Sequence, residues 1–138
     1  MVKNNIIHKI AAVVIEDNKY LLVRKVEKDI LTSLGGKPEN NETEQEALIR
    51  EIQEEAGCNA NIIRKMGDFV DDAIFDPGMK VKLSVYLVEL KGKIHLDDPE
   101  IAEIIWIDKD WKKKGYKLTH IQEYDVLPLC KKEGLLKW

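Results

Sequence analysis

The sequence predicts an α/β fold: a single domain over residues 1–138 in which an α/β/α sandwich encloses a central mixed β-sheet. Two segments have helical patterns, 44–56 in the middle of the chain and 119–133 near its end. Apolar segments of strand length flank the first of them. A chain of 138 residues suits one domain with a substantial core, and the pattern of elements alone leaves the order of the strands open.

The first part of the chain is rich in Ile, Leu and Val. Residues 6–16 and 20–26 are predicted strands joined by a turn at 17–19, so we expect a hairpin. Near-continuous hydrophobicity from Ile10 to Ile15 indicates a strand buried on both faces, as in a mixed sheet between helices. A short strand at 30–34 leads into a loop that contains two glycines.

The segment 44–56 is predicted to be a helix. It contains neither Gly nor Pro and is rich in Ala, Leu, Glu, Gln and Arg, which favour helices. Thr43, followed three residues later by Glu46, forms the capping-box pattern of a helix start. Gly57 supplies the stop because it tolerates the left-handed conformation that ends many helices.

The two faces of this helix differ in chemistry. Leu48 and Ile52 lie on an apolar stripe that should face the core, whereas Glu51, Glu54 and Glu55 gather on another side. Like charges at this spacing each cost roughly 0.2–0.5 kcal/mol, so a purely structural helix would mix lysines among them. Mg²⁺ takes oxygen ligands and neutralises such a cluster, which favours a site for a divalent cation.

The loop before the helix suggests what the cation acts on. Gly35 and Gly36 allow a ligand to approach the backbone closely. Lys37 offers a point charge to a phosphate group, and Asn41 suits a turn because it tolerates positive φ.

The second half of the chain supplies the remaining strands. Residues 60–69, 81–90 and 104–107 are predicted strands, and the loop 71–78 contains a Pro-Gly turn.

The helix at 119–133 is expected to start with a second capping box, formed by Thr119 and Gln122. Pro128 should remove one of its backbone hydrogen bonds and kink it, and Gly134 should end it. Its predicted buried residues are Ile121, Val126, Leu127, Leu129 and Cys130.

These residues resemble a known family signature. The Nudix hydrolases share the pattern G-x5-E-x7-R-E-U-x-E-E-x-G-U, where U is a bulky aliphatic residue. The matching positions are Gly36, Glu42, Arg50, Glu51, Ile52, Glu54, Glu55 and Gly57. Only Cys58 departs from the pattern, and Cys is a small apolar residue that buries well. The Leu-Leu-Val-Arg-Lys and Ala-Glu-Ile-Ile-Trp stretches and the final Leu-Pro helix are similar to the MutT-like branch of this family.

The resemblance implies the Nudix topology and a site around a divalent cation, Mg²⁺ with Mn²⁺ as a substitute. The implied metal set is Glu51, Glu54, Glu55 and Gly36. Arg50 is implied to hold Glu51 or Glu42 in place by a bidentate ion pair, which places Arg50 and Glu51 with the catalytic residues.

The general base is left open. The choices are Glu54 and one further Glu from the region before the 104–107 strand, either Glu100 or Glu103. Glu100 is slightly favoured because it lies deeper in its loop.

Substrate contacts are implied by the resemblance at four positions. Lys37 and Arg24 would meet phosphate, although Arg24 at a strand end is as easily a solvated charge. Phe75 is available to stack on a base, or it anchors its loop. His120 lies where relatives place base-recognising residues, and it also suits a surface or capping role.

The implied reaction is Mg²⁺-dependent hydrolysis of a nucleoside diphosphate linked to a variable group. The favoured substrate is a nucleoside triphosphate, oxidised ones included, split into monophosphate and pyrophosphate. ADP-ribose, a dinucleotide, a nucleotide sugar and a non-nucleotide diphosphate remain alternatives. A Nudix-fold sensor that binds nucleotide without hydrolysing it is a further alternative, although such proteins usually lose carboxylates that are all present here.

The composition of the chain argues against some classes of binding partner. A net charge of −3 argues against nucleic-acid binding through a broad basic patch, which leaves a small nucleotide as the expected partner. No apolar run is long enough to cross a bilayer, and the N-terminal residues lack a signal-peptide pattern. With two cysteines and no spaced framework, we expect a cytoplasmic protein, monomeric or homodimeric.

Overall fold

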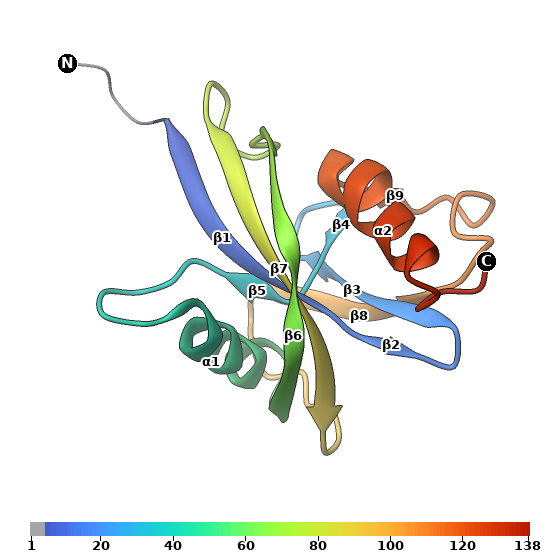
Figure 1. The fold of residues 1–138 in the computed structure, drawn as a ribbon, viewed down its shortest axis with the longest axis horizontal. Coiled ribbons are helices and arrows are strands. Elements are labelled where there is room, and N and C mark those ends of the chain that lie inside the picture. Colours follow the sequence, from blue (N-terminus) through green and yellow to red (C-terminus); the bar gives the residue numbers. More distant parts are fainter. Residues whose placement is uncertain (1–4) are drawn as a thin grey trace.

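Two β-sheets and two helical segments make up residues 5–138, the part of the chain that the computed structural model describes (Figure 1). The first sheet has the strand order β5–β1–β7–β6. Its strands are β1 (Ile6–Val13), β5 (Gly35–Gly36), β6 (Asn59–Asp72) and β7 (Lys80–Lys91). β1 and β7 are parallel and the other pairs antiparallel, so the sheet is mixed as predicted.

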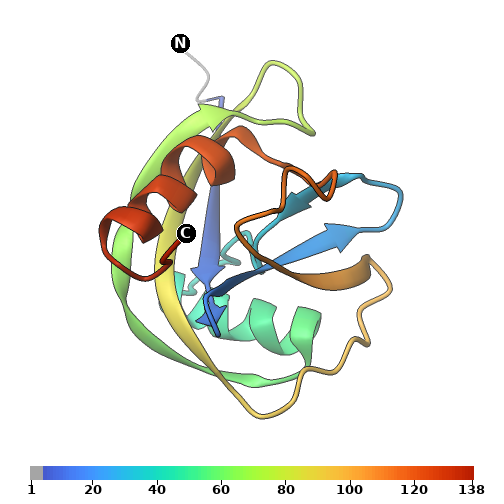
Figure 2. The same ribbon diagram turned by 90° about the vertical axis from the view of Figure 1, so that its right-hand side faces the viewer.

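The second sheet has the order β2–β3–β4–β9, and β8 also pairs with β3. Its strands are β2 (Ile15–Glu16), β3 (Lys19–Lys25), β4 (Ile30–Thr32), β8 (Ile101–Ile107) and β9 (Lys117–Leu118). The helix α1 (Glu44–Ala56) lies on one side of the first sheet and the C-terminal helical segment on the other (Figures 1 and 2). The predicted α/β/α arrangement around mixed strands is confirmed, with the strands divided between two sheets.

β1 contributes to both hydrophobic cores. Ile10 and Ala12 pack in the core that also contains the apolar face of α1, whereas Ala11 and Val13 pack in the core beneath the C-terminal helical segment. Successive side chains of a strand point to opposite faces, so a strand between two cores is apolar at every position. The prediction of a strand buried on both faces is confirmed.

α1 has the predicted bounds and caps. The Thr43 hydroxyl accepts a hydrogen bond from the Glu46 backbone N–H at 3.1 Å, and the Glu46 carboxylate accepts one from the Thr43 N–H at 2.9 Å. Gly57 ends the helix at φ 64°. Leu48 and Ile52 are fully buried, which stabilises the fold by roughly 1.5–3 kcal/mol each. This packing fixes the rotation of the helix, and with it the direction of the acidic face.

The expected hairpin between 6–16 and 20–26 is confirmed only next to its turn. Asp17 and Asn18 have positive φ and form a tight turn, but only Ile15 and Glu16 pair with β3. The preceding residues form β1 in the other sheet, because pairing with β7 lets both faces of that apolar strand be buried.

The C-terminal helical segment differs from the expected kinked helix. A π-helical turn, η1 (Gln122–Val126), precedes α2 (Leu127–Lys132), and the Leu127 N–H donates to the Gln122 carbonyl. The Thr119 hydroxyl accepts from the Gln122 N–H at 3.4 Å, but the Gln122 side chain accepts from the buried Tyr20 hydroxyl instead of completing a capping box. Of the residues expected to be buried, Leu129 is only half-buried. None of the described helices has the length and apolar character to cross a bilayer.

Candidate active site

Arg50 joins the loop that precedes α1 to the acidic face of the helix. Its Nε and Nη2 donate to the two carboxylate oxygens of Glu42 at 2.7 and 3.0 Å, and Nη2 also donates to the Lys37 carbonyl at 3.1 Å. Its Nη1 donates to Glu51 at 3.1 Å and to Glu54 at 3.2 Å. The ion pair expected with Glu51 or Glu42 is therefore formed with both, and the hydrogen bonds from Arg50 lower the pKa of Glu42.

The two glycines of this loop let the backbone lie directly on carboxylates of the helix. A Cβ on Gly36 would lie 2.5 Å from Glu51 Oε1. Gly35 has φ 145°, where a Cβ would lie 2.0 Å from the Ile10 carbonyl oxygen, and its N–H donates to Glu55 Oε1 at 2.8 Å. A side chain at Gly36 would push the loop away from the helix, and one at Gly35 would push it away from β1.

Of the three glutamates on the acidic face of α1, Glu51 is partly buried and Glu55 is almost fully buried. Glu55 is only 4% exposed, and burial raises its pKa to about 8, although the hydrogen bond from Gly35 acts in the opposite direction. Burial also raises the pKa of Glu51, and Arg50 counteracts this. Glu55 is therefore mainly protonated near pH 7 until a cation offsets its charge.

These groups open into one cavity of about 370 Å³, which we call the carboxylate cavity. It is lined by Lys9, Lys25, Gly35, Gly36, Lys37, Pro38, Glu39, Glu51, Glu54, Glu55, Asp98 and Glu100. It thus brings together all three helix glutamates, Gly36, Lys37 and one of the two predicted loop glutamates, Glu100.

The donor set of this cavity fits a hard divalent cation. Carboxylate oxygens are the ligands that Mg²⁺ prefers, and a nearly buried carboxyl such as Glu55 lacks a full countercharge. Among residues 5–138, no three His, Cys, Asp or Glu side chains are arranged as a ready metal site. Arg50 accounts for part of this, because it draws Glu51 and Glu54 toward its guanidinium group.

Arg24 and Glu103 lie outside this cavity. They are register partners on β3 and β8, and Arg24 Nε donates to Glu103 Oε1 at 2.7 Å. Neither lines the cavity. Of the two loop glutamates, the geometry places Glu100 in the cavity and leaves Glu103 paired with Arg24.

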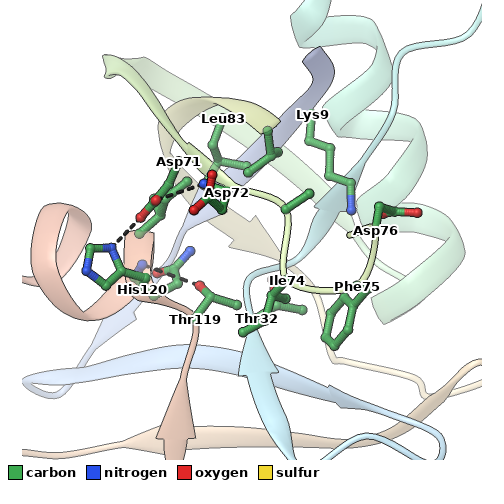
Figure 3. A pocket seen from close by; sticks show the side chains of 14 residues that line it. Lys9, Thr32, Asp71, Asp72, Ile74, Phe75, Asp76, Leu83, Thr119 and His120 are labelled. Carbon is green, nitrogen blue, oxygen red and sulfur yellow. Dashed lines mark hydrogen bonds and ion pairs between the residues drawn. The ribbon is translucent and has the colours of Figure 1, made fainter. Parts of the chain in front are cut away.

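A second cavity, of about 380 Å³, contains the other two predicted substrate contacts (Figure 3). We call it the loop cavity, because the β6–β7 loop forms one wall. Its apolar lining is Ala73, Ile74, Phe75, Val81, Leu83 and Ile121. Its polar lining is Lys9, Thr32, Asp71, Asp72, Asp76, Thr119, His120 and Gln122. The size and mixed lining are typical of small-molecule sites.

Contacts within the loop cavity hold its walls together. The Asp71 carboxylate contacts His120 Nδ1, which joins the end of β6 to the start of the C-terminal helical segment (Figure 3). Beside the cavity, the ring centroids of His120 and Tyr124 lie 4.6 Å apart, and Lys28 Nζ lies 4.9 Å from the centre of the Phe75 ring, although Tyr124 and Lys28 do not line the cavity. Phe75 and His120 therefore line the loop cavity and not the carboxylate cavity.

Sequence reasoning missed Lys9, Lys25 and Asp98. Lys9 lines both cavities, and Lys25 and Asp98 line the carboxylate cavity. A signal for Lys9 exists in the sequence, because it is a lysine within the apolar stretch that forms β1. Nothing local distinguishes Lys25 or Asp98 from solvated surface charges.

Known proteins are similar to this chain in fold. The pattern of the NUDIX domain matches residues 7–127. No curated protein matches the chain significantly in sequence. A UDP-X diphosphatase structure has a TM-score of 0.80 at 21% identity, with 98% of this chain and 66% of that chain covered. The chain thus spans just under two thirds of the length of that relative.

Two further structures match over nearly their whole length. The MutT protein from Methanosarcina mazei Go1 has a TM-score of 0.80 at 18% identity, covering 96% of this chain and 99% of that chain. An ADP-ribose pyrophosphatase from Streptococcus suis 89-1591 has a TM-score of 0.71 at 18% identity, covering 95% and 93%. At these identities the likeness shows the fold alone.

The NUDIX match includes the loop and helix that build the carboxylate cavity, and the resemblance seen in the sequence is confirmed. Among the structural neighbours of this chain are MutT proteins. The chain belongs to the Nudix hydrolase family, a family of pyrophosphohydrolases.

Proposed function

We propose that the protein hydrolyses a phosphoanhydride bond in a nucleoside diphosphate linked to a variable group, with a nucleoside triphosphate, oxidised ones included, as the favoured substrate. One observation carries this proposal: the carboxylate cavity and the loop cavity are neighbours that share a lining residue, Lys9. A ligand that has a nucleoside at one end and a diphosphate at the other would occupy the two together.

Glu51, Glu54, Glu55 and Gly36 are the residues that would hold Mg²⁺ or Mn²⁺ in the carboxylate cavity. The bound ion would polarise the phosphoryl group and lower the pKa of water. Arg50 would keep Glu51 and Glu54 in place through the contacts it makes to both. Lys37 in the same cavity would offset charge that develops on the departing phosphate.

In the hydrolytic step, a water oxygen attacks phosphorus and the P–O bond to the departing phosphate breaks. The departing oxygen takes the bonding electron pair, and a carboxylate accepts the water proton. Glu54 and Glu100 are the two candidates for this base because both line the carboxylate cavity. Glu103 is a weaker candidate because it is held by Arg24.

The loop cavity is the proposed nucleoside site. Phe75 offers an aromatic face for stacking on a base, and the apolar Ile74 and Leu83 line the same space. Asp71 and His120 provide polar atoms near the opposite wall, where the edge of a base would be recognised (Figure 3).

A product-release screen tests this proposal. Purified protein is incubated with Mg²⁺ or Mn²⁺ and the nucleoside triphosphates, 8-oxo-dGTP, ADP-ribose, dinucleoside polyphosphates and nucleotide sugars, and products are separated by chromatography. We expect a triphosphate to yield monophosphate and pyrophosphate in equal amounts. Release of single phosphate groups, or no hydrolysis of any compound, would overturn the proposal.

Cleavage of ADP-ribose or a nucleotide sugar is the main alternative. The UDP-X diphosphatase and the ADP-ribose pyrophosphatase share the fold of this chain, although their names describe those proteins only. A non-catalytic sensor is the remaining alternative, and it would bind a nucleotide in the same screen without forming product.

A further inference from the structure

Lys9 holds an unusual position between the two cavities. It lies on β1, on the same face of the strand as Ala11 and Val13, because side chains two residues apart share a face. Its strand is paired with β7, where Lys9 is opposite Leu83. This pairing fixes the backbone, so only the side chain of Lys9 is free to adjust. Figure 3 shows it extending from β1 toward the loop that carries Asp76.

The charge of Lys9 lacks a partner. Surface lysines such as Lys80 and Lys117 form ion pairs with carboxylates, but Lys9 forms none with any residue in the described part of the chain. Burial lowers the pKa of Lys9, the nearby Lys25 lowers it further, and Asp76 partly opposes these effects. A half-buried cation without a countercharge costs free energy, which a bound anion would recover.

The neighbouring charges indicate where an anion would be held. Lys25 and Lys37 line the carboxylate cavity together with Lys9, so positive groups face its glutamates. On the other side, Asp71, Asp72 and Asp76 make the lining of the loop cavity acidic. Lys25 and Lys37 both lie close enough to Lys9 to lower its pKa, so positive charge gathers at the Lys9 end of the carboxylate cavity. An anionic group is therefore attracted to that end, and repelled from the glutamates of the carboxylate cavity and from the aspartates of the loop cavity.

We propose that Lys9 binds the phosphate group next to the ribose and so couples the nucleoside site to the carboxylate cavity, an inference that rests on the proposed function. Lys9 is then a substrate-binding residue that recognises the nucleoside monophosphate portion shared by all the candidate nucleotide substrates. A lysine ammonium is a compact charge that can contact a single phosphate oxygen, which leaves the other oxygens of that phosphate free for other partners.

A purely structural role for Lys9 and a role in anion binding predict different effects of its replacement on stability. If Lys9 only covers apolar surface with its methylene chain, its replacement weakens the fold or leaves it unchanged. If Lys9 is held for an anion, its replacement by an uncharged side chain of similar length stabilises the ligand-free protein and weakens phosphate binding.

The test compares Lys9→Met and Lys9→Arg with Lys109→Met, a control at an exposed lysine that lines neither cavity. Calorimetry with Mg²⁺ measures binding of AMP, GMP, CMP and UMP and of the four corresponding nucleosides, and scanning calorimetry without ligand measures Tm. For the monophosphate that binds wild type best, Lys9→Met should raise Kd about 10- to 100-fold, as for loss of a charged hydrogen bond. Its effect on the matching nucleoside should stay within about threefold, and its Tm should rise by roughly 2–5 °C.

Lys9→Arg should retain most of the monophosphate affinity, and Lys109→Met should behave as wild type. The proposal is overturned if Lys9→Met binds the monophosphate as wild type does, if it loses nucleoside affinity equally, or if its Tm falls. Failure of wild type to bind any monophosphate would also overturn it. The product-release screen judges the hydrolase function separately, since wild-type turnover does not depend on these binding results.

Discussion

The carboxylate cavity and the loop cavity have similar volumes, about 370 and 380 Å³, but they are assembled differently. Most of the carboxylate cavity comes from two nearby segments, 35–39 and 51–55, locked together by Arg50. The loop cavity collects residues from β1, the β6–β7 loop and the start of the C-terminal helical segment. The comparison indicates that the chemical end of the site is locally encoded, whereas the recognition end depends on distant segments meeting.

Their electrostatics differ as well. In the carboxylate cavity, Arg50 makes hydrogen bonds to Glu42, Glu51 and Glu54, so the acidic groups are fixed in direction. In the loop cavity, the pair formed by Asp71 and His120 is the principal polar contact between walls. We therefore expect changes in the first cavity to alter turnover and changes in the second to alter substrate preference.

The largest effect is expected from Glu54→Gln. An amide still accepts the hydrogen bond from Arg50 but cannot accept a proton or bind a cation as a carboxylate does, so kcat should fall by roughly 10²- to 10⁴-fold. Glu54 has a side chain that is 54% exposed, so Tm should change by little. Steady-state kinetics and thermal unfolding measure the two quantities. Wild-type turnover in this variant would remove Glu54 from the mechanism, and Glu100→Gln is the matched test of the other base.

The next largest effect is a dependence of stability on pH that arises from Glu55. Its pKa is about 8 in the folded protein against a usual value of 4.5, so between these values the folded state binds a proton that the unfolded state has lost. Stability without metal should therefore fall as pH rises from about 5 to 8, by at most about 1.4 kcal/mol per pH unit.

Urea unfolding in EDTA across pH 5–9 measures this slope. Glu55→Gln keeps an oxygen that can accept the Gly35 N–H bond but does not titrate, so its profile should be flatter than that of wild type. Parallel profiles for the two proteins would show that Glu55 is not the titrating group.

A smaller effect is expected from Mg²⁺ itself. A cation that binds only the folded protein stabilises it by about 2.7 kcal/mol at 100 times its Kd. Millimolar Mg²⁺ should accordingly raise Tm by several degrees in wild type, and by less in Glu51→Gln, which lacks one carboxylate of the cavity. Equal Tm shifts in the two proteins would count against a metal site at Glu51.

The smallest effect should come from the loop cavity. Replacing Phe75 by Ala removes a stacking surface worth roughly 1–3 kcal/mol, so KM for the preferred nucleotide should rise about 5- to 100-fold while kcat changes little. A fall in kcat as large as the rise in KM would mean that Phe75 also positions the reacting phosphate. That result would contradict the assignment of substrate preference to the loop cavity and of turnover to the carboxylate cavity.

The sequence predicted the carboxylate side of the site well. The bounds of α1, its capping box and the common side of Glu51, Glu54 and Glu55 all follow from contacts three or four residues apart. The family signature implied that Arg50 holds Glu51 or Glu42, and the structure shows contacts to both. Such features depend on local geometry that repeats in every helix.

The sequence was less informative where the partners of a residue are distant in the chain. The 6–16 strand was expected to pair with its neighbour in the chain, but most of it pairs with β7, about 74 residues away. For Arg24 the sequence left a phosphate contact and a solvated charge equally open, and it did not indicate the hydrogen bond that Arg24 forms to Glu103 across the sheet. Periodicity shows which residues are apolar, but it does not indicate which strand they face.

By itself, therefore, the sequence determined the central helix, the acidic edge of that helix and the family to which the chain belongs. Only the tertiary structure decided that Lys9 joins two cavities, that Glu100 rather than Glu103 lines the carboxylate cavity, and that His120 contacts Asp71. The physical reason is range: helix faces follow from bonds between close residues, whereas a cavity is the space left where remote segments pack against one another.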